Sequence, residues 1–148
     1  MSRIVSFRGQ LNMGVEERIP LSTNKGLIGY KVKKFQILSS TPGVGDVEYI
    51  AQIYKTEDAA NINTTPDFSD NRLIAVAYYQ DDSSISHSSS VDIIFDNEKF
   101  NQDIFINITD AGGGTKRCNY YIELEQMKLD LNEQTVATLK DIRNVGAE

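Results

Sequence analysis

The sequence contains very few of the residues on which reactive sites depend. Its 148 residues include one histidine, one cysteine and no tryptophan. The lone Cys118 cannot close an internal disulfide, so the fold does not depend on an oxidising compartment. One histidine and one cysteine are also too few for a usual zinc site. We therefore expect a protein that is not an enzyme, binds no cofactor and works through its surface.

Long apolar runs and excess positive charge are also missing. No apolar run approaches the roughly 20 residues that span a bilayer, and the first eight residues alternate polar and apolar side chains, unlike a signal peptide. The net charge is −6. Proteins that bind duplex DNA gain most of their affinity from Lys and Arg on phosphates. We expect neither a membrane nor a nucleic acid as a partner.

The charge is unevenly distributed along the chain. Residues 1–55 carry eight Lys and Arg against four Asp and Glu, a balance of +4, whereas residues 56–130 carry five against fourteen, a balance of −9. Such asymmetry can guide docking between copies of a subunit. Alternatively, strands from the two segments interleave in the fold and mix the charges locally. The sequence leaves both interpretations open.

The sequence is rich in strand patterns, in which apolar and polar residues alternate with a period of two. Eight segments show this pattern or a short, continuously apolar version of it: 5–13, 15–21, 28–38, 47–54, 72–80, 91–95, 104–109 and 119–129. Regularly spaced short strands build sandwiches or barrels. We predict an all-β fold, an antiparallel, jelly-roll-like β-sandwich of about eight strands that forms a single domain over residues 1–148.

Local signals add detail to this prediction. The apolar parity of segment 28–38 changes near Lys33 and Lys34, which predicts a β-bulge. The polar stretch Lys55–Asn71 is expected to be a long loop or a crossover. Segments 104–109 and 119–129 are expected to pair as a hairpin. Strands should end at residue 129, and a capping pattern from Asp130 predicts a short C-terminal α-helix over 130–146.

No residue is assigned as catalytic, cofactor-binding or metal-binding, although three groups of residues invite comparison with known sites. His87 lies in a serine-rich stretch that offers no rigid third group to orient an imidazole. Glu123 and Glu125 share one strand face, as expected of solvated side chains. The run Gly112–Lys116 has its Lys after its Thr and precedes a strand, unlike a phosphate-binding loop. It is interpreted as a flexible hairpin tip.

Calcium remains an open alternative. Asp67, Asp70, Asp81 and Asp82 flank a single strand and offer the oxygen ligands that calcium prefers. The EF-hand pattern fails, because Arg72 replaces the glycine at position six and Tyr78 replaces the glutamate at position twelve. Acids that cap turns are the default interpretation.

Four stretches of the chain resemble small proteins encoded by tailed bacteriophages of marine bacteria. They are Ser2–Gly9, Gly29–Ile37, Phe100–Phe105 and Cys118–Leu124. The resemblance spans the whole chain and has no diagnostic motif, so it assigns no functional residue. It implies a virion component with a jelly-roll-like or related sandwich fold, present in many symmetric copies.

The resulting hypothesis is a non-enzymatic structural protein of a phage virion, in particular a capsid decoration or cement subunit. Its partners would be the major capsid protein or other virion proteins, and copies of itself in a homo-oligomer, for which a trimer is one candidate. It would be made in the host cytoplasm and located in the virion. Two alternatives stay open: a carbohydrate-binding sandwich that uses exposed tyrosines, and a protein associated with the tail or connector.

Overall fold

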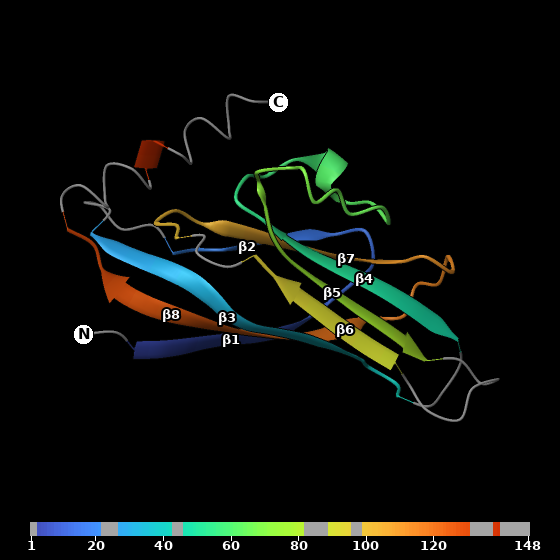
Figure 1. Cartoon of the computed structure of the whole chain (residues 1–148). Helices are drawn as coiled ribbons and strands as arrows, with labels where there is room; N and C mark the ends of the chain where they lie inside the picture. Colours follow the sequence, from blue (N-terminus) through green and yellow to red (C-terminus); the bar gives the residue numbers. More distant parts are fainter. Residues whose placement is uncertain are drawn as a thin grey trace.

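The computed structural model describes residues 3–21, 27–42, 46–81, 89–95, 99–130 and 138–139. Within these ranges the chain forms a β-sandwich of eight strands and one short 3₁₀ helix (Figure 1). The strands are β1 (Arg3–Leu11), β2 (Glu16–Ile19), β3 (Ile28–Ser39), β4 (Val47–Tyr54), β5 (Leu73–Asp81), β6 (Ser89–Ile94), β7 (Ile104–Asp110) and β8 (Cys118–Lys128), and the helix is η1 (Ala59–Asn61).

The strands form two antiparallel sheets, one of three strands in the order β1-β8-β3 and one of five in the order β2-β7-β4-β5-β6. The first strand pairs with the last, the second with the second-last, and the two middle strands with each other. A long hairpin that is rolled up gives this connectivity, the jelly-roll form of the double Greek key. The predicted all-β, jelly-roll-like sandwich is confirmed.

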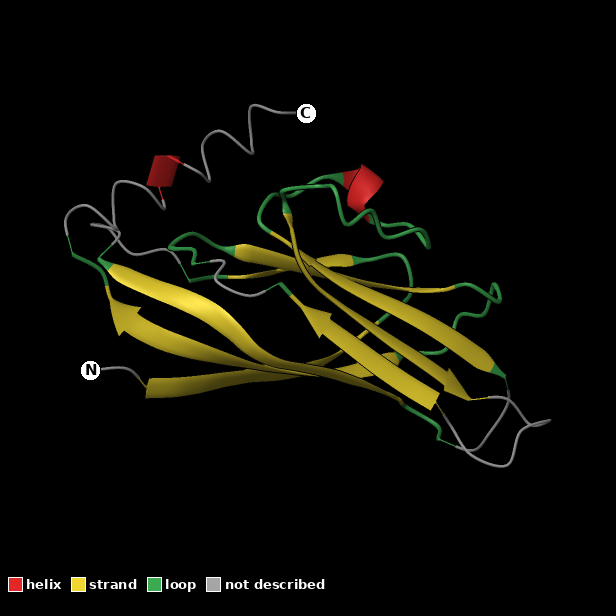
Figure 2. Cartoon of the chain, viewed as in Figure 1, coloured by secondary structure: helices red, strands yellow, loops and turns green. Residues whose placement is uncertain are grey.

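The core lies between the two sheets. Alternate side chains of each sheet point inward, such as Phe35 and Ile122 from the three-stranded sheet and Tyr49 and Ile106 from the five-stranded one, all with no exposed surface. In β4 the side chains on the outer face are also largely buried, because the segment between β4 and β5 folds back over the outer face of the five-stranded sheet (Figure 2). This explains why β4 is apolar on both parities.

The bulge predicted near Lys33 and Lys34 is present. The pairing of β3 with β8 shifts register between Val32 and Lys34. Basic β3 lies beside acidic β8, with Lys34 Nζ 4.0 Å from a carboxylate oxygen of Glu123 and Lys31 opposite Glu125. In this sheet the strands interleave and mix the charges locally, as one of the two interpretations of the charge asymmetry requires.

One expectation about connections is corrected, and one pair of alternatives is decided. β7 and β8 do not form a hairpin, because β7 pairs with β2 and β4 while β8 pairs with β1 and β3 in the other sheet. The seven residues between them exceed the usual two to five of a hairpin loop and are long enough to cross between sheets. Lys55–Asn71 joins neighbouring antiparallel strands, so it is a long loop and not a crossover.

The predicted C-terminal helix over 130–146 lies almost entirely outside the described residues. Thr138 and Leu139 are described and have helical backbone. The Asn101 amide nitrogen donates a hydrogen bond to the Thr138 hydroxyl at 2.9 Å.

Cys118 is a core residue with no exposed surface at the start of β8. Burial raises the pKa of its thiol to about 12. Because the thiolate is the reactive form, we expect no modification of the native protein by an aromatic disulfide reagent at pH 8 and one thiol modified per chain in denaturant. Rapid stoichiometric labelling without denaturant would contradict this burial.

Candidate interaction surface

Two of the acids considered for calcium, Asp70 and Asp81, lie at opposite ends of β5. Asp70 precedes β5 and Asp81 ends it, so a nine-residue strand of about 30 Å separates them. Both Asp70 oxygens accept hydrogen bonds from the Arg72 guanidinium, at 3.0 and 2.9 Å, and these bonds lower the pKa of Asp70. Asp67 accepts bonds from the Ser69 hydroxyl and backbone N–H. Asp82 lies outside the described residues.

The remaining sequence candidates have structural partners or lie outside the described residues. Glu123 accepts a hydrogen bond from the Tyr121 hydroxyl at 2.8 Å on the outer face of β8. The glycine-rich run is anchored by Asp110, whose Oδ1 accepts bonds from the backbone N–H groups of Gly112 and Glu48. Gly113 has φ +81°, a conformation that favours glycine. His87 is not described.

The part of the chain that the structure describes contains no cluster of three or more His, Cys, Asp or Glu side chains that could hold a metal ion. Among the same residues, no helix has the length and apolar character that a membrane-spanning helix requires.

A buried polar network holds the long loop on the five-stranded sheet. Gln52 of β4 has no exposed surface, and its amide nitrogen donates to the Asn63 carbonyl at 2.9 Å. Its Oε1 accepts a 2.6 Å bond from the Tyr54 hydroxyl. Asn107 of β7 donates to the Asn61 carbonyl at 3.1 Å. These side chains replace the backbone pairing that an irregular loop lacks.

Glu16 of β2 joins the same network and gives a pH prediction. Its carboxylate accepts bonds from the Asp58 N–H at 3.1 Å and from the Asn61 amide at 3.3 Å, and burial raises its pKa above the ordinary 4.5. A raised folded-state pKa stabilises the fold at low pH, and this contribution is lost as the pH rises through that pKa. Glu16→Gln should remove this loss.

The measurement is urea unfolding at several pH values between 4 and 7. The stability of the Gln variant relative to the wild type, measured as the difference in the free energy of unfolding, should increase as the pH rises. Glu125→Gln, on the outer face of β8 in the other sheet, is the matched control and should leave the pH profile unchanged. If the stability of Glu16→Gln and of the wild type changed with pH in the same way, the raised pKa assigned to Glu16 would be contradicted.

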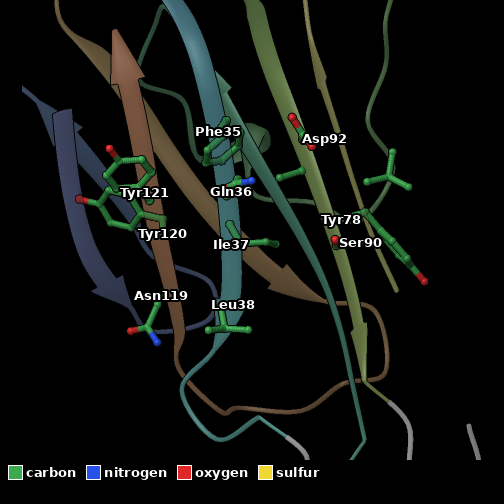
Figure 3. A pocket seen from close by; sticks show the side chains of 12 residues that line it. Phe35, Gln36, Ile37, Leu38, Tyr78, Ser90, Asp92, Asn119, Tyr120 and Tyr121 are labelled. Carbon is green, nitrogen blue, oxygen red and sulfur yellow. The ribbon is translucent and has the colours of Figure 1, made fainter. Parts of the chain in front are cut away.

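One open side of the sandwich lies between β3 and β6. These strands end their respective sheets, and neither pairs with a further strand in the described ranges, apart from a bridge between Tyr30 and Phe100. A groove of about 410 Å³ runs between them, lined by residues 35–38 of β3 and Ser90–Asp92 of β6 (Figure 3). We call residues 35–39 and 89–94 together the open side.

The open side presents unpaired backbone groups from both strands. The Phe95 N–H donates to the Ile74 carbonyl of β5. Because backbone groups alternate in direction along a strand, the N–H and C=O groups of Ser90, Asp92 and Ile94 point away from β5. On β3, the Ser40 N–H donates to the Arg117 carbonyl beside β8. The same alternation turns the backbone N–H and C=O groups of residues 35, 37 and 39 away from β8, toward the open edge.

Large apolar side chains are exposed around this side. Leu38 is 47% exposed, Val91 53% and Ile93 39%. Val91 and Ile93 lie opposite Tyr78 and Val76 on the outer face of β5, where Tyr78 points away from β3 (Figure 3). Leu38 lies on the outer face of the three-stranded sheet, so these side chains flank the groove from both sheets. Exposed apolar side chains grouped around a groove commonly mark a contact surface.

A mostly polar surface adjoins the groove, which Gln36, Asn119 and Tyr121 also line. Across the outer face of the three-stranded sheet, Arg8, Tyr121 and Gln36 occupy one row, and Gln10, Asn119 and Leu38 occupy the next. The Gln10 amide donates to Asn119 at 3.0 Å. An aromatic ring among amide and charged side chains can contact both the apolar and the hydroxyl faces of a sugar.

Sequence reasoning did not find the open side, because it arises from pairing between strands distant in the chain. The one local signal was the apolar character of both parities in 91–95. No family model matches the chain, and no curated protein matches it.

Proposed function

We propose that this protein is a non-enzymatic structural subunit of a phage virion, in particular a capsid decoration or cement subunit that acts through subunit contacts. The open side carries the proposal, because it combines unpaired strand edges with exposed Leu38, Val91 and Ile93. Assembly contacts use such surfaces. The jelly-roll connectivity adds support, since viral capsid proteins often have it.

The test is quantitative mass spectrometry of purified particles. A decoration subunit should be present in a fixed stoichiometric ratio to the major capsid protein. A few copies per particle would instead favour the tail or connector alternative. Particles that lack the protein altogether would overturn the proposal.

The second candidate is a carbohydrate-binding module, favoured by the row of Arg8, Tyr121 and Gln36 on the flat sheet face. Lectins also use jelly rolls. The test is a glycan array with the wild type and with Tyr121→Ala, with and without calcium. Binding that Tyr121→Ala abolishes would support this candidate, and no binding by the wild type would dismiss it.

A further inference from the structure

Asp92 is an acid on the inner face of an edge strand. It lies opposite Ala77 of β5, and residues directly opposite each other in an antiparallel pair point to the same face of the sheet. Ala77 belongs to the core between the sheets, so the Asp92 side chain also points toward the three-stranded sheet. Asp92 is nevertheless exposed, because β6 ends its sheet and the groove opens beside it. The carboxylate therefore faces the groove and not the outer surface.

The groove around this carboxylate has apolar walls. Phe35 and Ile37 line it from β3, and Ala77 lines it from β5 (Figure 3). Of the described residues that line the groove, Asp92 alone carries a charge. An occupant of the groove displaces water from this carboxylate, and a carboxylate that loses water without a positive partner is strongly destabilised. A well-matched occupant therefore brings a positive charge.

The free edge of β6 determines the form of this occupant. The N–H and C=O groups of Ser90, Asp92 and Ile94 point away from β5, and an extended segment can pair with them as an added strand. The residue opposite Asp92 in such a strand would place its side chain on the same face, beside the carboxylate. The two residues that flank it would lie on the outer face, opposite Val91 and Ile93.

We propose that the open side binds an extended segment of another protein, in which a lysine or arginine is flanked on both sides by apolar residues. The segment adds a strand to β6, and its basic side chain pairs with Asp92 in the groove. The aliphatic stem of that side chain lies along the apolar walls while its charged end reaches the carboxylate. The flanking apolar residues cover Val91 and Ile93, which removes exposed apolar surface from water.

The position of Asp92 also makes the site selective. A charge on the inner face of an edge strand is one device by which proteins prevent unwanted strand pairing. A neutral or acidic side chain opposite Asp92 would leave the carboxylate covered and without a counter-charge, whereas a basic one satisfies it. The same acid therefore rejects most strands and accepts the segment proposed here.

The test is selection from a random peptide library on the immobilised full chain, followed by fluorescence anisotropy with the most enriched peptide. We expect the enriched peptides to share one lysine or arginine between two apolar residues. Asp92→Lys should raise the dissociation constant about tenfold or more, as should a glutamate in place of the basic residue of the peptide. The two changes together should return the dissociation constant to within about threefold of its original value.

Two further variants separate the site from general effects of charge and folding. Glu57→Lys makes the same change in net charge at an exposed position of the loop between β4 and β5, so it is the matched control and should leave peptide binding unchanged. Ser90→Pro removes an N–H from the free edge but keeps the ladder to β5. It should weaken peptide binding while the circular dichroism spectrum stays native.

Enriched peptides without a basic residue would overturn the proposal, as would a basic preference that Asp92→Lys leaves intact. Failure to enrich any peptide would also overturn it, and a concentration-dependent dimer in sedimentation velocity would then identify a second copy as the occupant. These outcomes are separable from the virion hypothesis, although both rest on the open side. Peptide binding with these charge effects stands even if purified particles lack the protein.

Discussion

Replacing Phe35 with alanine is expected to lower the free energy of unfolding by about 3–5 kcal/mol. Phe35 has no exposed surface and lies in the core cluster directly after the bulge of β3. Removing a fully buried aromatic ring loses its transfer free energy and leaves a cavity that rigid strands on both sides cannot collapse to fill. Urea unfolding followed by circular dichroism measures the loss.

The neighbouring Gln36 supplies the matched control. It is exposed on the opposite face of the same strand, so Gln36→Ala should change stability by no more than about 0.5 kcal/mol. Should Phe35→Ala fail to fold, Phe35→Leu gives a smaller cavity and an intermediate loss. A loss below about 1 kcal/mol for the alanine variant would show that Phe35 does not fill the core.

The individual strands were predictable because their signal is local. In β8, Tyr120, Ile122 and Leu124 alternate with Tyr121 and Glu123, and the structure buries the first set more deeply than the second. The bulge of β3 was equally visible, since an inserted residue shifts the apolar parity. Alternation needs only one strand and one buried face to be informative.

The pairing of strands was less predictable, because it depends on contacts between distant parts of the chain. β7 and β8 are consecutive and both alternate, yet each is an interior strand of a different sheet. The connecting loop is tied down by Asp110 and by the Tyr49 hydroxyl, which donates to the Lys116 and Arg117 carbonyls. Tyr49 lies on β4, 67 and 68 residues from these two acceptors, so its contribution leaves no local pattern.

The candidate surface was hidden for the same reason. Nothing near Ser90 or Leu38 shows that their strands end two different sheets on one side of the sandwich. The long loop Lys55–Asn71 also looked featureless, although its polar residues find buried partners on β4 and β7. Composition indicated a loop, but its attachment to the sheet required the fold.

Replacing Gln52 with leucine is expected to cost about 3 kcal/mol and to release the long loop from the five-stranded sheet. The volume is nearly conserved, so the loss comes from broken hydrogen bonds. The Tyr54 hydroxyl loses its 2.6 Å acceptor, and the Asn63 carbonyl loses its 2.9 Å donor and keeps only the 3.1 Å bond from the Thr109 hydroxyl. Urea unfolding measures the global loss, and amide hydrogen exchange over residues 55–71 should accelerate.

A double-mutant cycle with Tyr54→Phe separates the two parts of that loss. Tyr54→Phe alone removes one donor and should cost about 1 kcal/mol. In the Gln52→Leu background the same change should be neutral or stabilising, because it removes a hydroxyl that has already lost its partner. Additive losses would show that the Gln52–Tyr54 bond does not hold this network together. In that case the loop would depend on Asn107 and Glu16, whose bonds to Asn61 and Asp58 both substitutions leave intact.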